Sequence, residues 1–594
     1  MYWMGADQAQ SGVPTPRKLM QAALLAIVLP TLVSYNGLPS PRAWQQISAF
    51  VGWGIFCTEL AKLLQGSVLV RSTGRLRWVF AALGLLAVGA WMAPLRNGMP
   101  PYFALATCGF LGACALCLGL GALAQRAGLG EVVFRRFCKA LVVAAACGVL
   151  IGAVQFFLPE WTDTLFIAHS GSEGRIGGNL RQPNLLCSLI LMALMALVWL
   201  VDPPGRTTYS TPRWTDPTAL ALVVFLGAGA APTLSRSGAV ILGLLFGWVM
   251  LDRGFGRRAK LAVGAFAATF YVVWPNVFAW QPMEAHARRA IVEVREEFVA
   301  SIRIDLWSQC IELIRQYPLA GVGWGEFNLA WTLTALKRWV LHYPDHAHNL
   351  EVHLAVELGL PLALLVCALL IMCLVSAARA LVAAVEPDRG VARAALTMVL
   401  VMVAHSQLEF PLWVACMLLP TAFALGLALG ARRADAGRES APISRRLGQG
   451  LAAGAVLLTL GGLWGAVDFA RTMRVSTAGA EASEAARGIL FYRLHADRVV
   501  EETLGQPLAA RDFSRASHLA PLLPSEITAW AQQLADRGET DKARYLVQRA
   551  REWRRLGPPS EFFAPCAHEA AAPGMPFQCA PPAGDWAFED FLRP

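Results

Sequence analysis

Charge is scarce in this sequence. Asp, Glu, Lys and Arg make up only 15% of its 594 residues, whereas ordinary soluble domains carry about 25%. Hydrophobic residues reach 56%, and soluble domains reach only about 45–50% even when Gly is counted with them. These proportions exclude an ordinary soluble enzyme, a disordered chain and a coiled coil. They indicate a helical membrane protein that crosses the bilayer many times.

Metal-binding patterns are also missing. No Cys/His zinc spacing occurs, and most of the 13 cysteines lie in apolar runs between Cys57 and Cys416. In such runs they are expected to be buried as small hydrophobic side chains. Cys566 and Cys579 are the only cysteines of the polar tail. An oxidising compartment would allow these two to form a disulfide, and two free thiols are the alternative.

Long apolar runs are abundant. A membrane-spanning helix needs about 20 mostly apolar residues. Thirteen segments reach or approach this length: 19–38, 43–64, 76–95, 101–123, 137–158, 183–201, 218–233, 237–252, 259–279, 350–378, 392–408, 412–430 and 448–467. We therefore predict an all-α, polytopic membrane protein with about thirteen transmembrane helices. The segments 218–233 and 237–252 are short, so a broken or re-entrant hairpin is the alternative for this pair.

The positions of Lys and Arg orient these segments. With the N-terminus in the cytoplasm, most basic residues near the segment ends fall on the cytoplasmic side, as the positive-inside rule requires. The short outer loops then hold only Arg42, Arg96, Arg175, Arg181 and Arg236. A shift by one segment would scramble this bias, so it supports thirteen spans as well as the orientation. The net charge of +10 is thus mainly a topology signal, and no nucleic-acid partner is expected.

Two hydrophilic regions fall on the outer side in this arrangement, namely residues 280–349 and the tail. Within the tail, Trp530 to Ala550 predicts two amphipathic helices joined at Arg537-Gly538-Glu539. This pattern resembles one tetratricopeptide hairpin, and a general helical bundle is the alternative. We predict three regions: an N-terminal transmembrane region at 1–232, a second transmembrane region with the outer loop at 233–467, and a soluble helical C-terminal domain at 468–594.

Polar residues at membrane depth are costly and are candidates for function. Four such clusters lie on the outer side. The first, Gly177 to Asn184, opens the span at 183–201, where Gln182 and Asn184 offer amides near the interface. Pro183 suits a first helical turn. A helix entry without any ligand is the alternative interpretation.

The second cluster, Thr233 to Gly238, places Arg236 between two short apolar runs. If these runs are half-helices, Ser237 and Gly238 begin a helix whose N-terminal amides attract anions. Arg adds a fork of donors that suits phosphate. An Arg that snorkels to the lipid head groups is the alternative.

The third cluster combines Arg303 and Trp307, one helical turn apart, with a glycine-rich stretch from Tyr317 to Gly325. Alone it indicates only an amphipathic helix at the interface. The fourth runs from Asp345 to Leu350, at the start of the predicted span 350–378. Two further polar residues, His353 and Glu357, follow this cluster. Because His346, Asn349, His353 and Glu357 are spaced 3, 4 and 4 apart, we expect these four to share one helix face.

Three interpretations apply to these histidines. A metal site is conceivable, but no further His/carboxylate cluster completes it. A structural His is the second. The third is a catalytic base, because His titrates near neutral pH and can take a proton from a hydroxyl group. Arg236 and Arg303 would then hold a departing pyrophosphate and stabilise the charge it gains. No Asp-x-Asp pattern for a divalent metal occurs in the outer loops, so no metal is expected.

These clusters form a set of motifs in a fixed order: Leu234 to Gly238, Arg303 with Trp307, Pro318 to Gly325, His348-Asn349, and Glu357 to Gly359. The set resembles the O-antigen ligase/polymerase superfamily. Gly178 to Asn184 and His405 to Leu412 are similar to motifs of one branch, the bacterial protein O-oligosaccharyltransferases, which are pilin-glycosylation ligases. A polar C-terminal domain also fits that branch.

The resemblance implies a membrane fold of the GT-C type and a metal-independent glycosyltransferase without a cofactor. Such an enzyme moves a glycan from undecaprenyl pyrophosphate to an acceptor hydroxyl. His348 is similar to the essential His of the family, and Arg236 and Arg303 are similar to its pyrophosphate-binding pair. Where the family commonly has an aromatic residue or Pro before that His, this chain has Asp345-His346-Ala347, so which His acts stays open. Supporting roles are expected for Gln182, Asn184, His346, Asn349, Glu357 and Glu409.

The resemblance also implies a bacterial inner membrane, with the active site and the C-terminal domain in the periplasm. The expected acceptor is a periplasmic protein such as a pilin. An O-antigen ligase that acts on lipid A-core, or an O-antigen polymerase, is the alternative. A transporter for the lipid-linked glycan is a hypothesis of another class. It is disfavoured because the sequence lacks internal repeats and because Glu59 and Lys62 lie near a span end.

Overall fold

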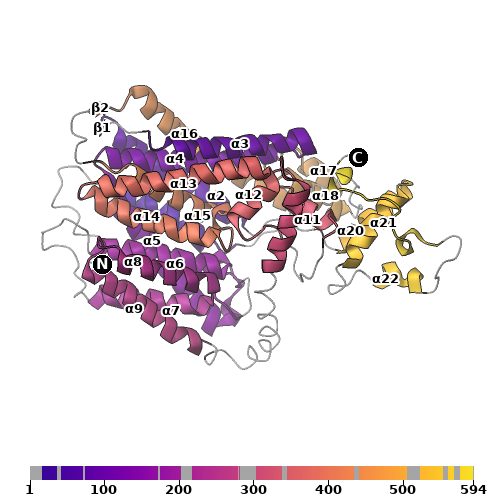
Figure 1. The fold of residues 1–594 in the computed structure, drawn as a ribbon, viewed down its shortest axis with the longest axis horizontal. Coiled ribbons are helices and arrows are strands. Elements are labelled where there is room, and N and C mark those ends of the chain that lie inside the picture. Colours follow the sequence, from indigo (N-terminus) through magenta and orange to yellow (C-terminus); the bar gives the residue numbers. More distant parts are fainter. Residues whose placement is uncertain are drawn as a thin grey trace. The chain divides into compact units, whose positions relative to one another are not determined.

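The computed structural model describes the following residues: 17–35, 42–70, 74–170, 174–201, 217–277, 280, 303–336, 344–433, 440–504, 522, 524–552, 560–567 and 575–592. Within them the secondary structure is almost entirely helical (Figure 1). Strands β1 (Val68–Val70) and β2 (Ser440–Pro442) form one short antiparallel pair. The predicted all-α class is therefore confirmed.

The chain packs as two compact units, each made of three separate stretches. The first unit comprises Met1–Ala81, Gly109–Val292 and Leu369–Ala466. The second unit comprises Ala82–Cys108, Glu293–Ala368 and Val467–Pro594. Four long helices carry residues of both units: α3 (Arg77–Asn97), α4 (Pro101–Arg126), α13 (Leu360–Ala383) and α16 (Arg445–Val475).

The first unit is a bundle of apolar helices, which are α1 (Arg17–Leu32), α2 (Ala43–Leu64), α5 (Gly130–Phe157), α6 (Pro183–Val201), α7 (Pro217–Ala230), α8 (Arg236–Leu251), α9 (Arg257–Val273), α14 (Asp388–Ser406) and α15 (Ala415–Leu429). Helix α6 is the centre, and all of its residues except Asn184 are buried. It packs against α5, α7, α8 and α14, and Figure 1 shows α6 to α9 alongside one another. A helix that is apolar on all sides is stable only when it is buried on all sides, which explains this central place.

The second unit joins the outer loop to the tail. Its helical parts are residues 303–316, here called the loop helix, with α11 (Phe327–Leu333), α12 (Leu350–Leu358), α17 (Ala482–Ala485), α18 (Arg493–Leu504), α20 (Pro524–Asp536), α21 (Thr540–Glu552) and α22 (Ser560–Phe563). Leu306 and Trp331 from the loop share one hydrophobic core with Trp530 and Tyr545 from the tail. The Tyr545 hydroxyl also donates to the Leu333 carbonyl oxygen at 2.6 Å.

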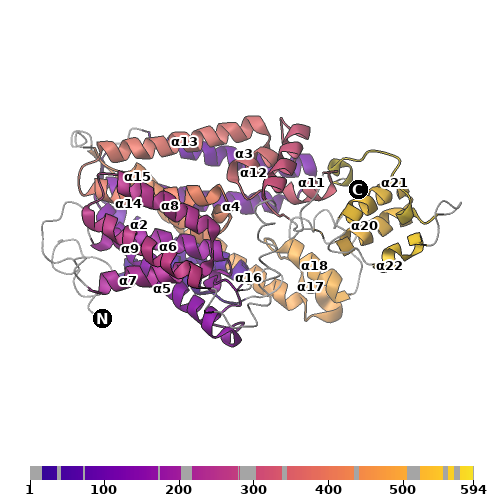
Figure 2. The same ribbon diagram turned by 60° about the horizontal axis from the view of Figure 1, so that its bottom comes forward.

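The tail contains the predicted helical hairpin. Helices α20 and α21 pack side by side (Figure 2), and Gly538 between them has a φ of 83°, a conformation that favours Gly. The hairpin is therefore confirmed. The compact units do not follow the predicted domain boundaries, because the loop and the tail bury their apolar side chains together. Those boundaries stay a prediction. Cys566 and Cys579 form a disulfide, which resolves the alternative that the sequence left open.

Each of the thirteen predicted runs contains a helix. Seven described helices are long and apolar enough to cross a membrane, namely α2, α3, α4, α5, α6, α13 and α16, and three shorter apolar helices occur at Pro217–Thr233, Arg236–Leu251 and Ala415–Leu429. The count of thirteen spans and the GT-C type stay predictions. The structure also leaves both alternatives for 218–233 and 237–252 in place, since it forms two separate short helices there.

The predicted span 350–378 is wrong as a single helix. Gly359, with a φ of 76°, separates α12 from α13. A side chain at this position would place its Cβ 2.4 Å from the Leu319 carbonyl oxygen, and the next amide, of Leu360, donates to the Pro318 carbonyl oxygen at 2.8 Å. The glycine-rich stretch at residues 317–325, here called the glycine loop, thus packs directly on the break between α12 and α13. Helix α12 has only 9 residues, too few to cross a hydrocarbon core of about 30 Å.

Candidate functional site

The predicted site residues fall into two groups, one in each compact unit. The first unit contains Gln182, Asn184, Arg236 and Glu409, and the second unit contains Arg303, His346, His348, Asn349 and Glu357. Each group is described within its own unit. A shared site for Arg236, Arg303 and His348 stays a prediction.

In the first unit, Gln182 serves the start of α6. The segment before it is a short 3-10 turn, Gly178–Leu180, followed by Arg181 with a φ of 57°. The Gln182 side-chain oxygen accepts the backbone N–H of Leu185 at 2.6 Å. This bond satisfies one of the amides that a helix start leaves without an internal partner. The helix-entry interpretation therefore describes Gln182 best.

Asn184 connects three parts of the first unit. Its side-chain oxygen accepts from the Ser235 hydroxyl at 2.7 Å and from the Arg175 guanidinium at 3.2 Å. Its amide nitrogen donates to the Glu409 carboxylate at 2.9 Å. The start of α6 is thus tied to the start of α8 and to the connection between α14 and α15. The structure brings together Asn184, Glu409 and the residue that precedes Arg236.

Arg236 is the first residue of α8 and is exposed. Ser235 caps this helix, because its hydroxyl accepts the Gly238 N–H at 2.9 Å. A Cβ on Gly238 would lie 2.3 Å from the Cys187 sulfur, so Gly is what lets the first turn of α8 approach α6. A guanidinium group at a helix N-terminus gives a positive potential that suits an anionic ligand.

Three residues that form hydrogen bonds in this unit were not predicted as site residues: Arg175, Ser188 and His405. Arg175 donates to the Thr233 carbonyl oxygen at 2.9 Å as well as to Asn184. Arg175 was predicted only as a charge in a short outer loop, although its place two residues before Gly177 is a signal that it belongs to the motif. The Ser188 hydroxyl and the His405 ring form a buried hydrogen bond of 2.8 Å between α6 and α14.

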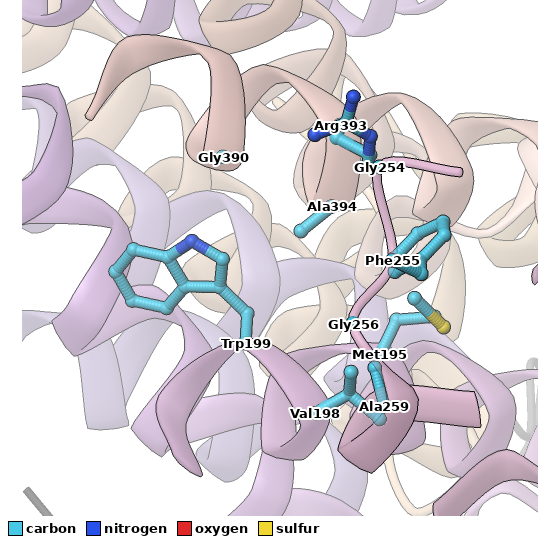
Figure 3. Close-up of a pocket in the computed structure, with 10 residues that line it drawn as sticks. All are labelled: Met195, Val198, Trp199, Gly254, Phe255, Gly256, Ala259, Gly390, Arg393 and Ala394. Carbon is cyan, nitrogen blue, oxygen red and sulfur yellow. The ribbon is translucent and has the colours of Figure 1, made fainter. Parts of the chain in front are cut away.

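A small cavity of about 30 Å³ lies between the C-terminal end of α6 and the N-terminal end of α14, lined by Met195, Trp199, Phe255 and Arg393 among others (Figure 3). Arg393 forms an ion pair with Asp252 at 3.1 Å. None of the predicted site residues lines this cavity. It is therefore not the candidate site.

In the second unit, the peptide of Ala347 is held from both sides. Its carbonyl oxygen accepts from the Trp307 indole N–H at 2.9 Å, and its N–H donates to Nδ1 of His353 at 3.4 Å. Ala347 is 0% exposed. Trp307 lies on the loop helix, one turn after Arg303. The contact therefore joins the helix that carries Arg303 to residues 345–348, here called the histidine turn, which carry His346 and His348.

The rings of His346 and His348 converge across this fixed peptide. His348 has a φ of 51°, in the left-handed region that non-Gly residues seldom adopt. Residues two apart then turn toward one another, and Nε2 of His346 lies 3.1 Å from Nδ1 of His348. The Nδ1 atom of His346 bonds to the Asp345 carboxylate. The Asp345 side chain is 60% exposed. Its partial burial would raise its pKa, but this hydrogen bond and the neighbouring His lower the pKa below its ordinary value.

The predicted single helix face is wrong for His346 and Asn349. Asn349 is the N-cap of α12, since its side-chain oxygen accepts the Val352 N–H at 2.9 Å. The helix begins only at Leu350, so the 3,4,4 spacing extends beyond it. His353 and Glu357 do share a helix face, and Nε2 of His353 lies 3.5 Å from the Glu357 carboxylate.

Glu357 fixes the glycine loop on α12. Its carboxylate accepts the Gly325 N–H at 3.0 Å, and its main-chain oxygen accepts the Gly323 N–H at 3.0 Å. Burial raises the pKa of Glu357 to about 8. Nearby Glu326 is 0% exposed, and burial, together with the charge of Glu357, raises its pKa to about 8 as well. The second unit therefore holds two buried acids beside the histidine turn.

We expect a Glu326→Gln variant to be more stable than the native protein toward alkaline pH. Because the pKa of Glu326 is raised on folding, the unfolded chain ionises first, and the native protein loses stability as pH rises from about 5 to 8. The loss is at most about 1.4 kcal/mol per pH unit for one group. Thermal unfolding in detergent across this range checks it, with Glu312→Gln, at a side chain that is 46% exposed, as the control. A constant difference between variant and native protein at all pH values would contradict the prediction.

Comparisons with known proteins match three parts of the chain. The family described as O-antigen ligase matches residues 221–367, and the family described as protein glycosylation ligase matches residues 176–201. The C-terminal family of virulence factor membrane-bound polymerases matches residues 393–553. The chain is 27% identical over 278 residues to a general O-oligosaccharyltransferase of Acinetobacter baylyi, which covers 45% of each chain. The chain thus spans less than half the length of this relative.

These matches cover both groups of site residues. The O-antigen ligase match includes Arg236, Arg303 and His348, and the shorter match includes Gln182 and Asn184. The chain is thus similar to the O-antigen ligases over the first of these ranges and to the protein glycosylation ligases over the second.

Proposed function

We propose that this protein is an oligosaccharyltransferase that moves a glycan from undecaprenyl pyrophosphate to a Ser/Thr hydroxyl of a periplasmic protein such as a pilin. The observation that carries the proposal is the histidine turn, which Trp307 holds against the loop helix at 2.9 Å. That contact lies within the part of the chain that matches the O-antigen ligase family. It gives a base and a guanidinium group, Arg303, on elements that are fixed to each other.

In the proposed reaction, the acceptor oxygen attacks the anomeric carbon of the glycan, and the bond from that carbon to the pyrophosphate oxygen breaks. His348 takes the hydroxyl proton. The lipid pyrophosphate leaves with one additional negative charge, which Arg236 and Arg303 stabilise. Pyrophosphate is already a good leaving group, so the reaction needs no divalent cation, and we expect transfer to continue in excess EDTA.

Three observations support a protein acceptor. The relative from Acinetobacter is a general O-oligosaccharyltransferase, and the match at residues 176–201 is to protein glycosylation ligases. In addition, the hairpin of α20 and α21 shares a hydrophobic core with the loop helix. A docking domain with such a core is fixed relative to the histidine turn. Lipid A-core, or another glycan in a polymerase, is the alternative acceptor.

We place the active site and the tail in the periplasm, with the N-terminus in the cytoplasm. The distribution of Lys and Arg supports this orientation. The disulfide between Cys566 and Cys579 supports it independently, because disulfides persist in the oxidising periplasm and are rare in the cytosol. In a bacterium, this arrangement corresponds to the inner membrane.

A reconstituted assay tests the proposed function. The full-length protein in liposomes is given a glycan on undecaprenyl pyrophosphate, with a pilin or lipid A-core offered separately, and the products are identified by mass spectrometry. We expect the glycan on a Ser or Thr of the pilin, with and without EDTA. Product on lipid A-core alone would reject the protein acceptor. Loss of activity in EDTA would reject the metal-independent reaction.

A further inference from the structure

We propose that Asp345 and His346 form a relay that fixes the proton arrangement of His348. This inference rests on the proposed function, because it assumes that His348 is the base. It concerns His346, which the sequence left as a second candidate for that role. In the relay His346 is a positioning residue, and only His348 meets the acceptor.

Three side chains stand in series in the second unit. The Asp345 carboxylate bonds to Nδ1 of His346, and Nε2 of His346 lies 3.1 Å from Nδ1 of His348. His346 is only 7% exposed, so water competes little for its ring nitrogens. The two imidazole centroids are 4.0 Å apart. The contacts therefore connect one carboxylate to the base through one buried ring.

The chemistry of each group sets the direction of the bonds. A carboxylate only accepts, so Nδ1 of His346 must carry a hydrogen. A neutral imidazole with a hydrogen on Nδ1 has a lone pair on Nε2, which accepts from Nδ1–H of His348. The lone pair of His348 is then on Nε2. This is the nitrogen that takes the proton of the acceptor hydroxyl.

The relay also acts after proton transfer. When Nε2 of His348 takes the proton, the ring becomes a cation that donates from Nδ1 to His346. The Asp345 carboxylate, whose pKa lies below its ordinary value, balances that charge through the intervening ring. A carboxylate behind a catalytic His acts in this way in hydrolases, where it holds the tautomer and stabilises the imidazolium without itself taking the proton. The proton leaves His348 to water before the next turnover.

The backbone holds the two rings in place. Ala347 is clamped between Trp307 and His353, and burial lowers the pKa of His353 to about 3, which keeps this ring neutral and able to accept at Nδ1. The left-handed conformation of His348 is one that a non-Gly residue adopts only at a cost in free energy. Such a conformation persists only where the surroundings enforce it. The clamp on the preceding residue does this.

The test compares His346→Ala with His346→Gln. The Gln side chain offers an oxygen that can accept from Nδ1 of His348, whereas Ala offers none. We expect His346→Ala to lower kcat by roughly 10–100-fold, the loss typical when a partner that orients a functional His is removed, with little change in KM for the lipid-linked glycan. His346→Gln should recover a large part of the loss. Exposed His169→Ala serves as the matched control and should transfer as the native protein does.

A measurement without turnover separates the relay from the proposed function. The ¹⁵N NMR shifts of labelled His tell which ring nitrogen carries the hydrogen, and the His348 signals are those missing from His348→Ala. We expect Nδ1–H on His348 in the native protein and in His346→Gln, and a shift toward Nε2–H in His346→Ala. An unchanged tautomer in His346→Ala would overturn the relay whatever the activity. Native transfer by His348→Ala, with loss in His346→Ala, would instead overturn the assignment of the base.

Discussion

A His348→Ala variant should lose glycan transfer by about 10²–10⁴-fold, which is the usual contribution of a general base, while it still inserts and folds. The side chain is half-buried, so its removal leaves no large cavity. The contacts that hold the turn involve the peptide of Ala347 rather than the His348 ring. The loss should therefore appear in kcat and not in the yield or the unfolding temperature.

The left-handed backbone of His348 calls for a second variant. Asn is the non-Gly residue that adopts this conformation most readily, so His348→Asn keeps the turn and removes the base. Both variants should be inactive in the reconstituted assay and should elute from size exclusion as the native protein does. Normal transfer by purified His348→Asn would defeat the assignment of His348 as the base.

The helices could be predicted because their signal is local. Apolar runs located both ends of α6, although α5 begins seven residues before its predicted run and α16 ends eight residues after its own. Gly538 located the turn of the tail hairpin. The break at Gly359 could not be predicted in the same way, because it lies within an apolar run. Its cause is the carbonyl group of Leu319, forty residues earlier in the chain, which leaves no space for a side chain.

In the candidate site too, the residue types could be predicted from local motifs, but contacts between residues far apart in the sequence could not. The motifs gave the residue types, but helical spacing gave the wrong partners for His346, because Asn349 is a cap rather than a helical residue. The shared core of the loop helix and the tail joins Leu306 to Trp530, more than 200 residues apart in the sequence. No periodicity indicates a contact at that distance. Arg175 was missed because a loop Arg has many ordinary explanations.

Arg236→Ala and Arg303→Ala should each lower transfer by about 10²–10³-fold, the loss typical of one electrostatic contact to a reacting oxyanion. Lys at either position keeps the charge but lacks the planar fork, so the Lys variants should lie between native protein and Ala. The chain offers a matched control for each residue. Arg257 is an exposed first residue of α9, as Arg236 is of α8, and Arg315 lies on the loop helix with Arg303.

The double variant is the most informative of this set. If both guanidinium groups stabilise the same pyrophosphate, the loss in Arg236→Ala/Arg303→Ala should be smaller than the product of the two single losses, because neighbouring contacts to one ligand are not additive. Losses that multiply would mean that the two Arg act on separate groups. Unchanged transfer in either single variant, with Arg257→Ala and Arg315→Ala also unchanged, would remove that Arg from the proposed pyrophosphate site.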